Sequence, residues 1–331
     1  MAGTEPRVVT NEEPRRVWEA VVAEKGKDRP SINLESIATP RVNIALTEDV
    51  GLGDITTAAT VPEHLVARAV ILAKEGGILA GIQVAEIVFR QLDPQIDFKA
   101  ELKDGDGLAA GRRICALRGN AQAILTGERV ALNFLQRLSG IATLTDRFVR
   151  RTRGTQARIT DTRKTAPGLR ILEKYAVRVG GGDSHRFGLY DMYLIKENHI
   201  AAAGSITEAV RRVREHMKST KGDIPIEVEA RTPEEVKEAC ECWVNRILLD
   251  NMTLTNVGRS LEIVENHKRE NVPPKTADAK ARFLDTEVSG GVSLDNVRDI
   301  ALTGVNYISV GALTHSYKSI DMSLLVEGIE G

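Results

Sequence analysis

The sequence predicts an α/β protein: an incomplete parallel α/β barrel of about six strands, preceded by a smaller α+β domain. Three observations support this fold class. A strand, a short loop and a helix recur after residue 157, and a sheet-and-helix pattern with turn signals comes before that region. The 331 residues are 42% apolar and 27% charged, which suits one large barrel or two domains.

The first 40 residues form a polar arm in this interpretation. Asn11 is a candidate N-cap, Pro14 suits a first helical turn and Gly26 a stop, so we expect one short helix with an apolar stripe. The stripe suggests that the arm docks on its own subunit or on a neighbouring one.

Residues 41–141 are expected to form the α+β domain, to which residues 316–331 return as a strand or edge segment. Strand, helix and strand patterns cover residues 67–76, 81–93 and 96–105.

Two further features belong to this first domain. A GLGD turn at residues 51–54 follows a short helix; because a strand before it and a lysine within it are absent, a structural turn is favoured over a phosphate loop. A long helix opens at Asn120, reaches Ser139 and Gly140, and continues to residue 153.

Residues 142–315 carry the barrel pattern. The predicted strands cover residues 157–162, 192–196, 224–230, 246–251, 283–290 and 307–311. The helices between them cover residues 169–177, 206–217, 233–244, 257–267 and 294–302. Six strands are too few for a regular eight-stranded barrel, so an open side must be covered by the first domain or by another subunit. The connection at residues 271–281 is expected to be a mobile loop without chemistry.

Charge is segregated along the chain, although the formal net charge is −1. Residues 129–170 hold ten Arg and Lys against two Asp, whereas residues 221–250 hold eight acids against four bases. A nucleic-acid-binding surface would interleave aromatic residues or show a known module, and neither is present. The acidic block opposite the basic one better suits a metal-assisted anion site.

Cysteine usage and hydropathy indicate the compartment. Cys115, Cys240 and Cys242 provide no disulfide framework, and the last two face different sides of one predicted helix, which argues against a shared metal. The sequence has neither an apolar run of about 18 residues nor the layout of a signal peptide. We therefore expect a cytoplasmic protein.

Positively charged side chains follow two successive predicted strands. Arg163 and Lys164 come after the first, His185 and Arg186 lie about twenty residues further on, and Lys196 ends the next strand. The carboxyl ends of parallel strands converge on one mouth. Arginine forks match carboxylate and phosphate geometry, so the mouth suits a ligand with several negative charges, unless these residues are a solvated basic rim.

Acids end two later strands. Glu227 and Glu229 share a strand face, with Glu229 nearer the exit, and Asp250 ends the next strand. Glu229 and Asp250 could hold Mg²⁺ or a ribose diol, or they could balance Lys164 or Lys196.

The last two strands run into glycine-containing loops, which consist of Ser289, Gly290 and Gly291 and of Gly311, Ala312 and Leu313. Backbone N–H groups of such loops bind phosphate in many barrels. The alternative is a pair of tight turns. His315 could assist a phosphate or be structural.

The ordered segments DTRKTAPGLR, EKYAV, GGG, HR and IKENH resemble quinolinate phosphoribosyltransferases, from about Ile44 to the C-terminus. Most relatives carry Asp where this chain has Glu197. The resemblance implies an open-faced sandwich for the first domain, and a homodimer or larger assembly in which that domain lies over the partner's barrel. It implies transfer of phosphoribosyl from phosphoribosyl pyrophosphate to quinolinate with decarboxylation, giving nicotinate mononucleotide, CO₂ and pyrophosphate in de novo NAD biosynthesis, with Mg²⁺ as cofactor.

The resemblance also implies roles for matching residues. Lys164, Lys196, Glu229 and Asp250 would be catalytic, the two acids would bind the metal, and Arg129 would reach the partner subunit's site. From the residues alone, Arg129 is a helix-surface charge. The substrate-binding set would be Arg129, Arg163, Lys164, Thr165, His185, Arg186, Lys196, Glu229, Asp250, Ser289, Gly290, Gly291, Gly311, Ala312 and Leu313.

Three other functions compete with this one. A Schiff-base aldolase would use Lys196 as its nucleophile, which requires an apolar pocket. A related enzyme could act on a different acid, and an anion-sensing protein would bind phosphorylated ligands without turnover.

Overall fold

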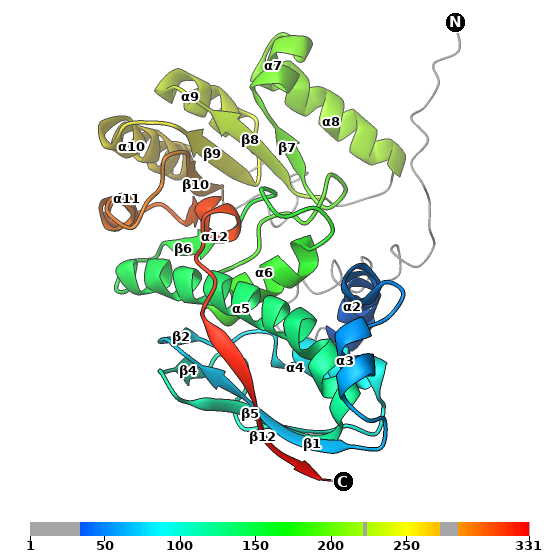
Figure 1. The fold of residues 1–331 in the computed structure, drawn as a ribbon. Coiled ribbons are helices and arrows are strands. Elements are labelled where there is room, and N and C mark those ends of the chain that lie inside the picture. Colours follow the sequence, from blue (N-terminus) through cyan, green and yellow to red (C-terminus); the bar gives the residue numbers. More distant parts are fainter. Residues whose placement is uncertain (1–33, 221–223, 272–283, 331) are drawn as a thin grey trace, which may run out of the picture.

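A computed structural model of the chain describes residues 34–220, 224–271 and 284–330. Within them the chain forms a barrel unit and a sheet-and-helix unit, with the long helix α5 (Ala121–Arg151) running between the two (Figure 1). The helix expected between Asn11 and Gly26 and most of the 271–281 loop lie outside the described residues. The described helices include none with the length and hydropathy needed to cross a membrane.

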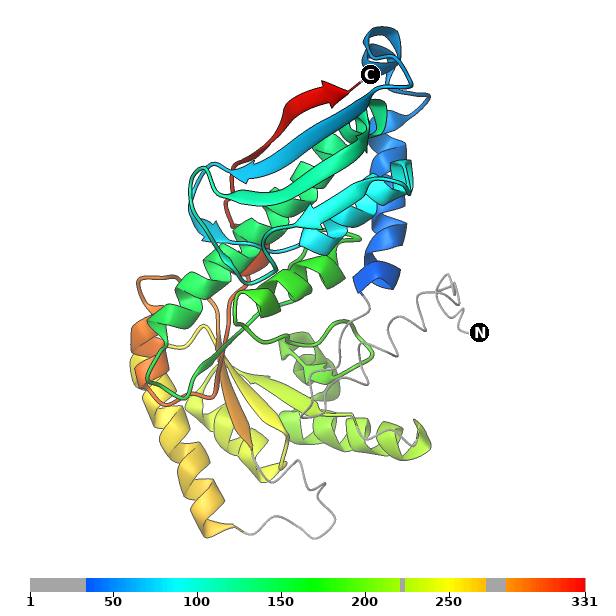
Figure 2. The ribbon, with the colours of Figure 1, turned by 90° about the horizontal axis from the view of Figure 1, so that it is seen from below.

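The smaller unit contains a four-stranded antiparallel sheet in the order β12-β1-β5-β3. Helices α4 (Ile82–Leu92) and α5 lie on one side of this sheet, and no described element covers the other side (Figures 1 and 2). A two-stranded ribbon lies beside it. The sheet strands are β1 (Val66–Ala73), β3 (Asp97–Ala100), β5 (Arg113–Asn120) and β12 (Met322–Glu330), and the ribbon is β2 (Gly77–Ile78) with β4 (Gly107–Leu108).

The end of the chain returns to this sheet. Strand β12 pairs antiparallel with β1, with Glu330 opposite Val66 and Met322 opposite Ala73. It is an edge strand that pairs with β1 at eight positions, and it follows the last barrel strand in the sequence.

Strand β5 was missed by the sequence analysis, although it lies between β1 and β3. Its two exposed arginines, Arg113 and Arg118, interrupt the apolar pattern that would otherwise indicate a strand. Arg113 pairs with Glu101 at 3.2 Å, just after β3, and Arg118 pairs with Glu330 of β12 at 2.7 Å, so both charges have partners in the folded chain.

The GLGD segment is a structural turn between α2 (Leu34–Val50) and α3 (Ile55–Thr60). Asp54 caps α3, since its carboxylate accepts the N–H of Thr57 at 3.0 Å and its Oγ1–H as well. Gly51 has φ +53°, a conformation that favours glycine.

Helix α5 is continuous through Ser139 and Gly140, as expected from the sequence. Ser139 Oγ accepts the N–H of Ala80 at 3.0 Å, and Gly140 gives the backbone of Lys318 room to approach. This pair therefore serves close packing. The domain boundaries expected after residues 40 and 141 both fall inside helices, the first in α2 and the second in α5. These boundaries remain predictions.

The larger unit is an incomplete parallel barrel, as predicted. Its sheet has the order β6-β11-β10-β9-β8-β7, which leaves β6 and β7 as the two edge strands. The strands are β6 (Arg158–Thr160), β7 (Tyr193–Ile195), β8 (Ile226–Ala230), β9 (Arg246–Asp250), β10 (Asp285–Ser289) and β11 (Tyr307–Ser309). The helices are α6 (Arg170–Val179), α7 (Glu197–Ala203), α8 (Ile206–Thr220), α9 (Pro233–Glu241), α10 (Leu254–Glu270), α11 (Val297–Leu302) and α12 (Ala312–His315); the short α7 and α12 were not predicted.

The register of these strands decides which side chains meet inside the barrel. Glu227 lies opposite Arg246, Glu229 and Glu287 lie opposite Leu248, and Ser289 lies opposite Asp250. Because side chains alternate along a strand, one sheet face carries all of these: Glu227, Glu229, Arg246, Leu248, Asp250, Glu287 and Ser289. The opposite face is apolar, with Val228, Ile247 and Leu249 fully buried as expected beneath the surrounding helices, so this polar face is the inner one.

The packing of Gly140 gives a stability test. A Cβ there would overlap the carbonyl oxygen of Lys318, whereas a Cβ on Gly258 in α10 meets no atom within 4 Å. We expect Gly140→Ala to lower the free energy of unfolding by about 1–3 kcal/mol through overpacking. Gly258→Ala should change it by less than about 1 kcal/mol, towards greater stability. Urea denaturation checks both, and a Gly140→Ala protein as stable as wild type would contradict this packing.

Candidate active site

The loop after β6 carries Arg163 and Lys164, and both residues are exposed. Two distant segments fix its shape. Thr314 Oγ1, from the loop after β11, donates to the Lys164 carbonyl at 2.8 Å. Arg41 Nε, from α2, donates to the Gly168 carbonyl at 2.8 Å. Both units of the chain therefore hold this loop at the carboxyl end of the sheet.

The second cationic cluster lies on the loop between α6 and β7. Arg186 is 7% exposed, and its Nη1 donates to the Met192 carbonyl at 3.2 Å. The pKa of Arg186 lies below its usual value, because burial disfavours its charge and Arg163 repels it. The structure thus brings Arg163 and Arg186 together, and two repelling guanidinium groups at one site favour an anionic ligand.

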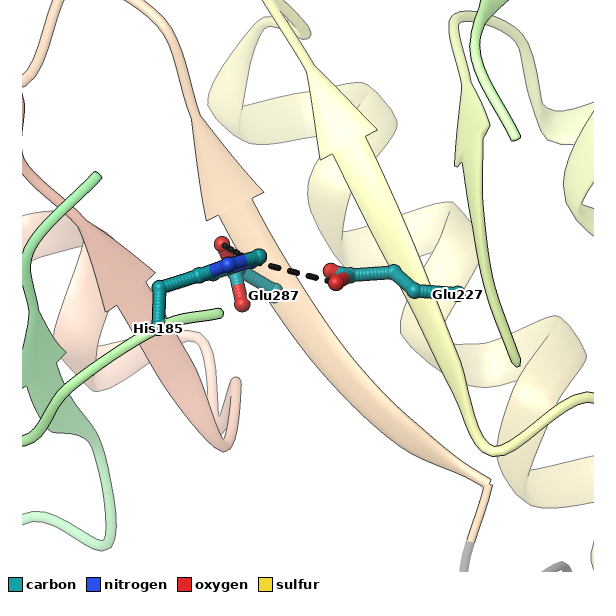
Figure 3. A group of neighbouring side chains, drawn as sticks. All are labelled: His185, Glu227 and Glu287. Atoms are coloured by element: carbon teal, nitrogen blue, oxygen red, sulfur yellow. Dashed lines mark ion pairs between the residues drawn. The ribbon is translucent and has the colours of Figure 1, made fainter. Parts of the chain in front are cut away.

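The ring of His185 points into the barrel. Figure 3 shows it facing two carboxylates, with Nε2 3.1 Å from Glu227 Oε2 and 3.4 Å from Glu287 Oε1. Its Nδ1 accepts the backbone N–H of Arg186 at 2.8 Å. Both ring nitrogens are engaged inside the protein, so the contribution of His185 to ligand binding stays a prediction, while its support of Arg186 is visible.

The protonation of His185 follows from these neighbours. Burial by itself would lower the pKa of His185, but Glu287 and Glu227 raise it to about 10. The contact from the Arg186 N–H leaves the ring proton on Nε2, and a second proton on Nδ1 would have to displace that contact. Both features place a proton on Nε2, between the carboxylates.

His185, Glu227 and Glu287 have the spacing of metal ligands, since their candidate ligand atoms lie within 4.8 Å of one another. Two contacts favour a different role. Nε2 carries a proton rather than a free electron pair, and Arg246 Nη1 already neutralises Glu287 at 2.7 Å. We interpret the two acids as buried counter-charges beneath the cationic mouth.

These counter-charges were largely missed from the sequence. Glu227 was recognised only as the neighbour of Glu229, and Glu287 was not singled out. The available signal was an acid in the middle of a predicted strand, in IEVEA and in DTEVS.

At the next strand exits, Lys196 and Glu229 form an ion pair. The Lys196 side chain is 45% exposed and the Glu229 side chain 7% exposed. The backbone N–H of Lys196 donates to His199 Nδ1 at 2.9 Å, at the start of α7. This ion pair matches the alternative in which the acid balances the lysine, and it ties the exits of β7 and β8 together.

Asp250 and the Ser289–Gly290 loop are joined through Asn251. Asn251 Nδ2 donates to Asp250 Oδ2 at 2.7 Å, and its backbone N–H donates to the Ser289 carbonyl at 2.9 Å. Asn251 has φ +53°, an uncommon conformation outside glycine, and a Cβ on Gly290 would overlap its side chain. The acid and the glycine loop are therefore fixed relative to each other.

Glu229 and Asp250 fit a Mg²⁺ ion only in part. They share the inner face at the ends of neighbouring strands, and Asp250 is half-buried. Two carboxylates do not complete an octahedral shell, but protein-bound Mg²⁺ usually keeps waters and takes substrate phosphates as further ligands. The donor set suits an ion that arrives with a phosphorylated substrate.

The loop after β11 borders a cleft of about 530 Å³. A Cβ on Gly311 would lie 3.0 Å from His315 Nε2 and 3.1 Å from Lys164 Cδ, so these groups surround the glycine closely. Leu313 has no solvent exposure and does not line the cleft, so its predicted contact with a ligand stays a prediction. The cleft is lined by Arg137, Lys164, Thr165, Ala166, Thr314, His315 and Tyr317.

Arg137 is a further cation that the sequence analysis did not identify. It lies on α5, pairs with the buried Glu173, and its guanidinium carbon lies 5.2 Å from the centre of the Tyr317 ring. Arg129 lies two helical turns earlier, is exposed, and forms no hydrogen bond or ion pair with any described residue. Within one chain, α5 thus brings Arg137 to the cleft, while Arg129 stays apart from the cationic clusters.

Comparison with known proteins covers both units. Residues 54–139 match the profile of the quinolinate phosphoribosyl transferase N-terminal domain, and residues 141–325 match that of its C-terminal domain. A Nicotiana glauca protein named quinolinate phosphoribosyltransferase [decarboxylating] 2, mitochondrial, is 42% identical over 90% of this chain and 83% of its own. A Bacillus subtilis (strain 168) protein named probable nicotinate-nucleotide pyrophosphorylase [carboxylating] is 44% identical over 86% of this chain and 91% of its own. The crystal structure of NadC from Streptococcus pyogenes has a TM-score of 0.79 and 35% identity, over 92% of this chain and 99% of that one.

The buried acids give a pH-dependent prediction. Burial opposes the charge of Glu287, but His185 and Arg246 lower its pKa from 4.5 to about 2. A carboxyl with a lowered folded-state pKa contributes stability above its unfolded-state pKa and loses it as the pH falls through the folded value. The stability difference between wild type and Glu287→Gln should therefore be largest near pH 5 and shrink as the pH falls from 4.5 towards 2. Urea unfolding at several pH values measures it, and a constant difference would contradict the ionised state.

Proposed function

This chain belongs to the quinolinate phosphoribosyl transferase family, and we propose that it transfers the phosphoribosyl group of phosphoribosyl pyrophosphate to quinolinate with loss of CO₂. The products are nicotinate mononucleotide, pyrophosphate and CO₂, in de novo NAD biosynthesis. The observation that supports this most strongly is the pair of cationic loops at the carboxyl ends of the strands, with Arg163 exposed on one and Arg186 buried on the other. Two adjacent guanidinium groups suit the two adjacent carboxylates of quinolinate.

The second substrate fits the remaining strand exits. Lys164 directly follows Arg163, Lys196 ends β7 beyond Arg186, and both supply positive charge for the pyrophosphate. Thr165 and the loops at Ser289–Gly291 and Gly311–Leu313 offer hydroxyl and backbone N–H groups for phosphate. Glu229 and Asp250 would hold the ribose and a Mg²⁺ ion, which when bound lowers the negative charge of the departing pyrophosphate.

The chemistry then requires positioning rather than a nucleophilic side chain. The pyridine nitrogen attacks the anomeric carbon, and the bond to pyrophosphate breaks with its electron pair leaving on oxygen. Positive charge develops on the sugar, where the carboxylates of Glu229 and Asp250 stabilise it. The adjacent carboxylate then departs as CO₂ and leaves the electron pair of the broken C–C bond on the ring carbon. The neighbouring quaternary nitrogen stabilises this carbanion, and the carbon then takes a proton.

We propose that the working unit is a homodimer or an assembly of dimers. The Arg129 side chain is exposed and has no ion-pair partner among the described residues, so a second molecule could supply the group that its charge meets. Three exposed apolar side chains also cluster in sequence where α2 passes into α3, namely Ile44, Leu52 and Ile55, which are 69%, 111% and 84% exposed. Exposed apolar groups of this kind are typical of a subunit interface.

The cytoplasmic location remains a prediction. The names of several plant relatives place those proteins in mitochondria or chloroplasts, so the location varies within the family.

The alternative functions fit the site less well. A Schiff-base lysine needs an apolar pocket, whereas Lys196 is half-exposed and paired with Glu229. A sensor without turnover would need the anion pocket but not the acids fixed at Glu229 and Asp250.

The direct test is an assay of nicotinate mononucleotide formation with quinolinate, with nicotinate as the control acid. Arg163→Ala should raise the KM for quinolinate roughly ten- to a hundredfold, because one charge-assisted contact is lost. Its melting temperature should stay close to that of wild type, since Arg163 is exposed. Unchanged kinetics would remove Arg163 from the site, and binding of both substrates without product would favour the sensor.

Sharing of the site between subunits can be tested by mixing two variants. At a quinolinate concentration near the wild-type KM, Arg129→Ala and Arg163→Ala should each retain only a small fraction of wild-type activity. If Arg129 serves the neighbour's site, random dimers of the two variants regain roughly a quarter of wild-type activity, because half of the dimers contain one intact site of two. No recovery after subunit exchange, verified by mass spectrometry of the mixed dimers, would place Arg129 outside the partner's site.

A further inference from the structure

Asp161 and Lys174 form a fully buried ion pair that the chemistry above does not use. Asp161 follows β6 and Lys174 lies in α6, and both side chains have 0% exposure. Taking two charges out of water is unfavourable by several kcal/mol per ion, so a buried pair usually serves something other than stability. The contacts of this pair indicate what it serves.

The pair holds the backbone of His185 from both sides. Asp161 Oδ1 accepts the His185 N–H at 2.9 Å, and Lys174 Nζ donates to the His185 carbonyl at 3.2 Å. The ammonium also lies 5.1 Å from the centre of the Phe187 ring. Both polar groups of one peptide residue are therefore bound by one ion pair, and the next residue along the chain is Arg186.

The same loop is also fastened at its base. Asp183 pairs with β6 as a parallel bridge, in which the Asp183 N–H donates to the Ile159 carbonyl at 2.8 Å and the Asp161 N–H donates to the Asp183 carbonyl at 3.2 Å. The buried pair extends this attachment beyond the last backbone contact with β6. It does so from Asp161, two residues before Arg163.

From these contacts we infer that Asp161 and Lys174 are positioning residues, which hold Arg163 and Arg186 at a fixed separation before any ligand binds. Without a ligand, the two guanidinium groups repel each other and would drive their loops apart. A preset separation matches a rigid ligand with two adjacent carboxylates and favours it over a monocarboxylate, because the ligand does not have to order the loops. The inference rests on the proposed function, and it attributes the preference for a diacid to the loop positions that Asp161 and Lys174 fix.

The decisive variant removes both charges together. A single Lys174→Met change would leave Asp161 buried without a partner, whereas Asp161→Asn with Lys174→Met is neutral and keeps an oxygen for the His185 N–H. The donor to the His185 carbonyl is lost. We expect the KM for quinolinate to rise about tenfold, while the KM for phosphoribosyl pyrophosphate changes less than about twofold. Amide exchange at residues 185–188 should become faster, with the amides of α6 unchanged.

Leu172→Ala is the matched control. Leu172 lies on the same helix, is 1% exposed and lies outside the proposed site, so its truncation weakens the packing of α6 without touching the pair. It should lower the melting temperature and leave both KM values unchanged. If the double variant raises both KM values equally, or changes neither KM nor exchange, the positioning role is wrong.

The exchange measurement separates this inference from the proposed function. If wild type does not convert quinolinate, the function fails, and exchange at residues 185–188 still reports on the ion pair. If the double variant does not fold, amide exchange in the ligand-free wild type tests the inference instead. A His185 amide as protected as those of α6 supports the preset loop, and one that exchanges like an exposed loop amide overturns it.

Discussion

The arrangement of this protein depends on holding several positive side chains together before an anion arrives. Arg163 and Arg186 approach each other at the mouth of the barrel, and Arg186 is nearly buried. Without compensation, the repulsion between these charges would separate the side chains or leave them hydrated. Buried carboxylates compensate this charge: Glu227 and Glu287 contact the His185 ring, and Asp161 accepts the His185 backbone N–H. Each acid stabilises the position of a cation without neutralising the group that faces the mouth.

The open barrel makes this arrangement possible. Because all six strands are parallel, their carboxyl ends form one rim, and the register places Glu229, Asp250 and Ser289 on the inner face at that rim. The edge left at β6 is also where the loop bearing His185 and Arg186 attaches, through Asp183. A closed barrel would place a strand at that edge. The missing strands are therefore what lets a second cationic loop lie beside the first.

Much of this organisation follows from the sequence, because it rests on local patterns. The six strands, the open sheet and the placement of Arg163, Lys164 and Lys196 at strand exits follow from apolar runs that end in charged residues. Strand β5 did not follow, because its arginines interrupt the apolar pattern and find their partners, Glu101 and Glu330, only in the folded chain. The buried pair of Asp161 and Lys174 did not follow either. A lysine within an amphipathic helix predicts a solvated charge, and only tertiary packing shows this one without exposure.

The central claim is that the mouth of the barrel is a preformed seat for an aromatic diacid beside a phosphorylated sugar. A crystal structure with quinolinate and a non-reactive analogue of phosphoribosyl pyrophosphate tests it most directly. We predict both carboxylates between Arg163 and Arg186, the pyrophosphate beside Lys164 and Lys196, and Arg129 of a second molecule over the ring, with the loop at residues 183–192 unmoved by binding. A diacid bound elsewhere, or one that reaches the arginines only after this loop is rebuilt, would contradict the claim.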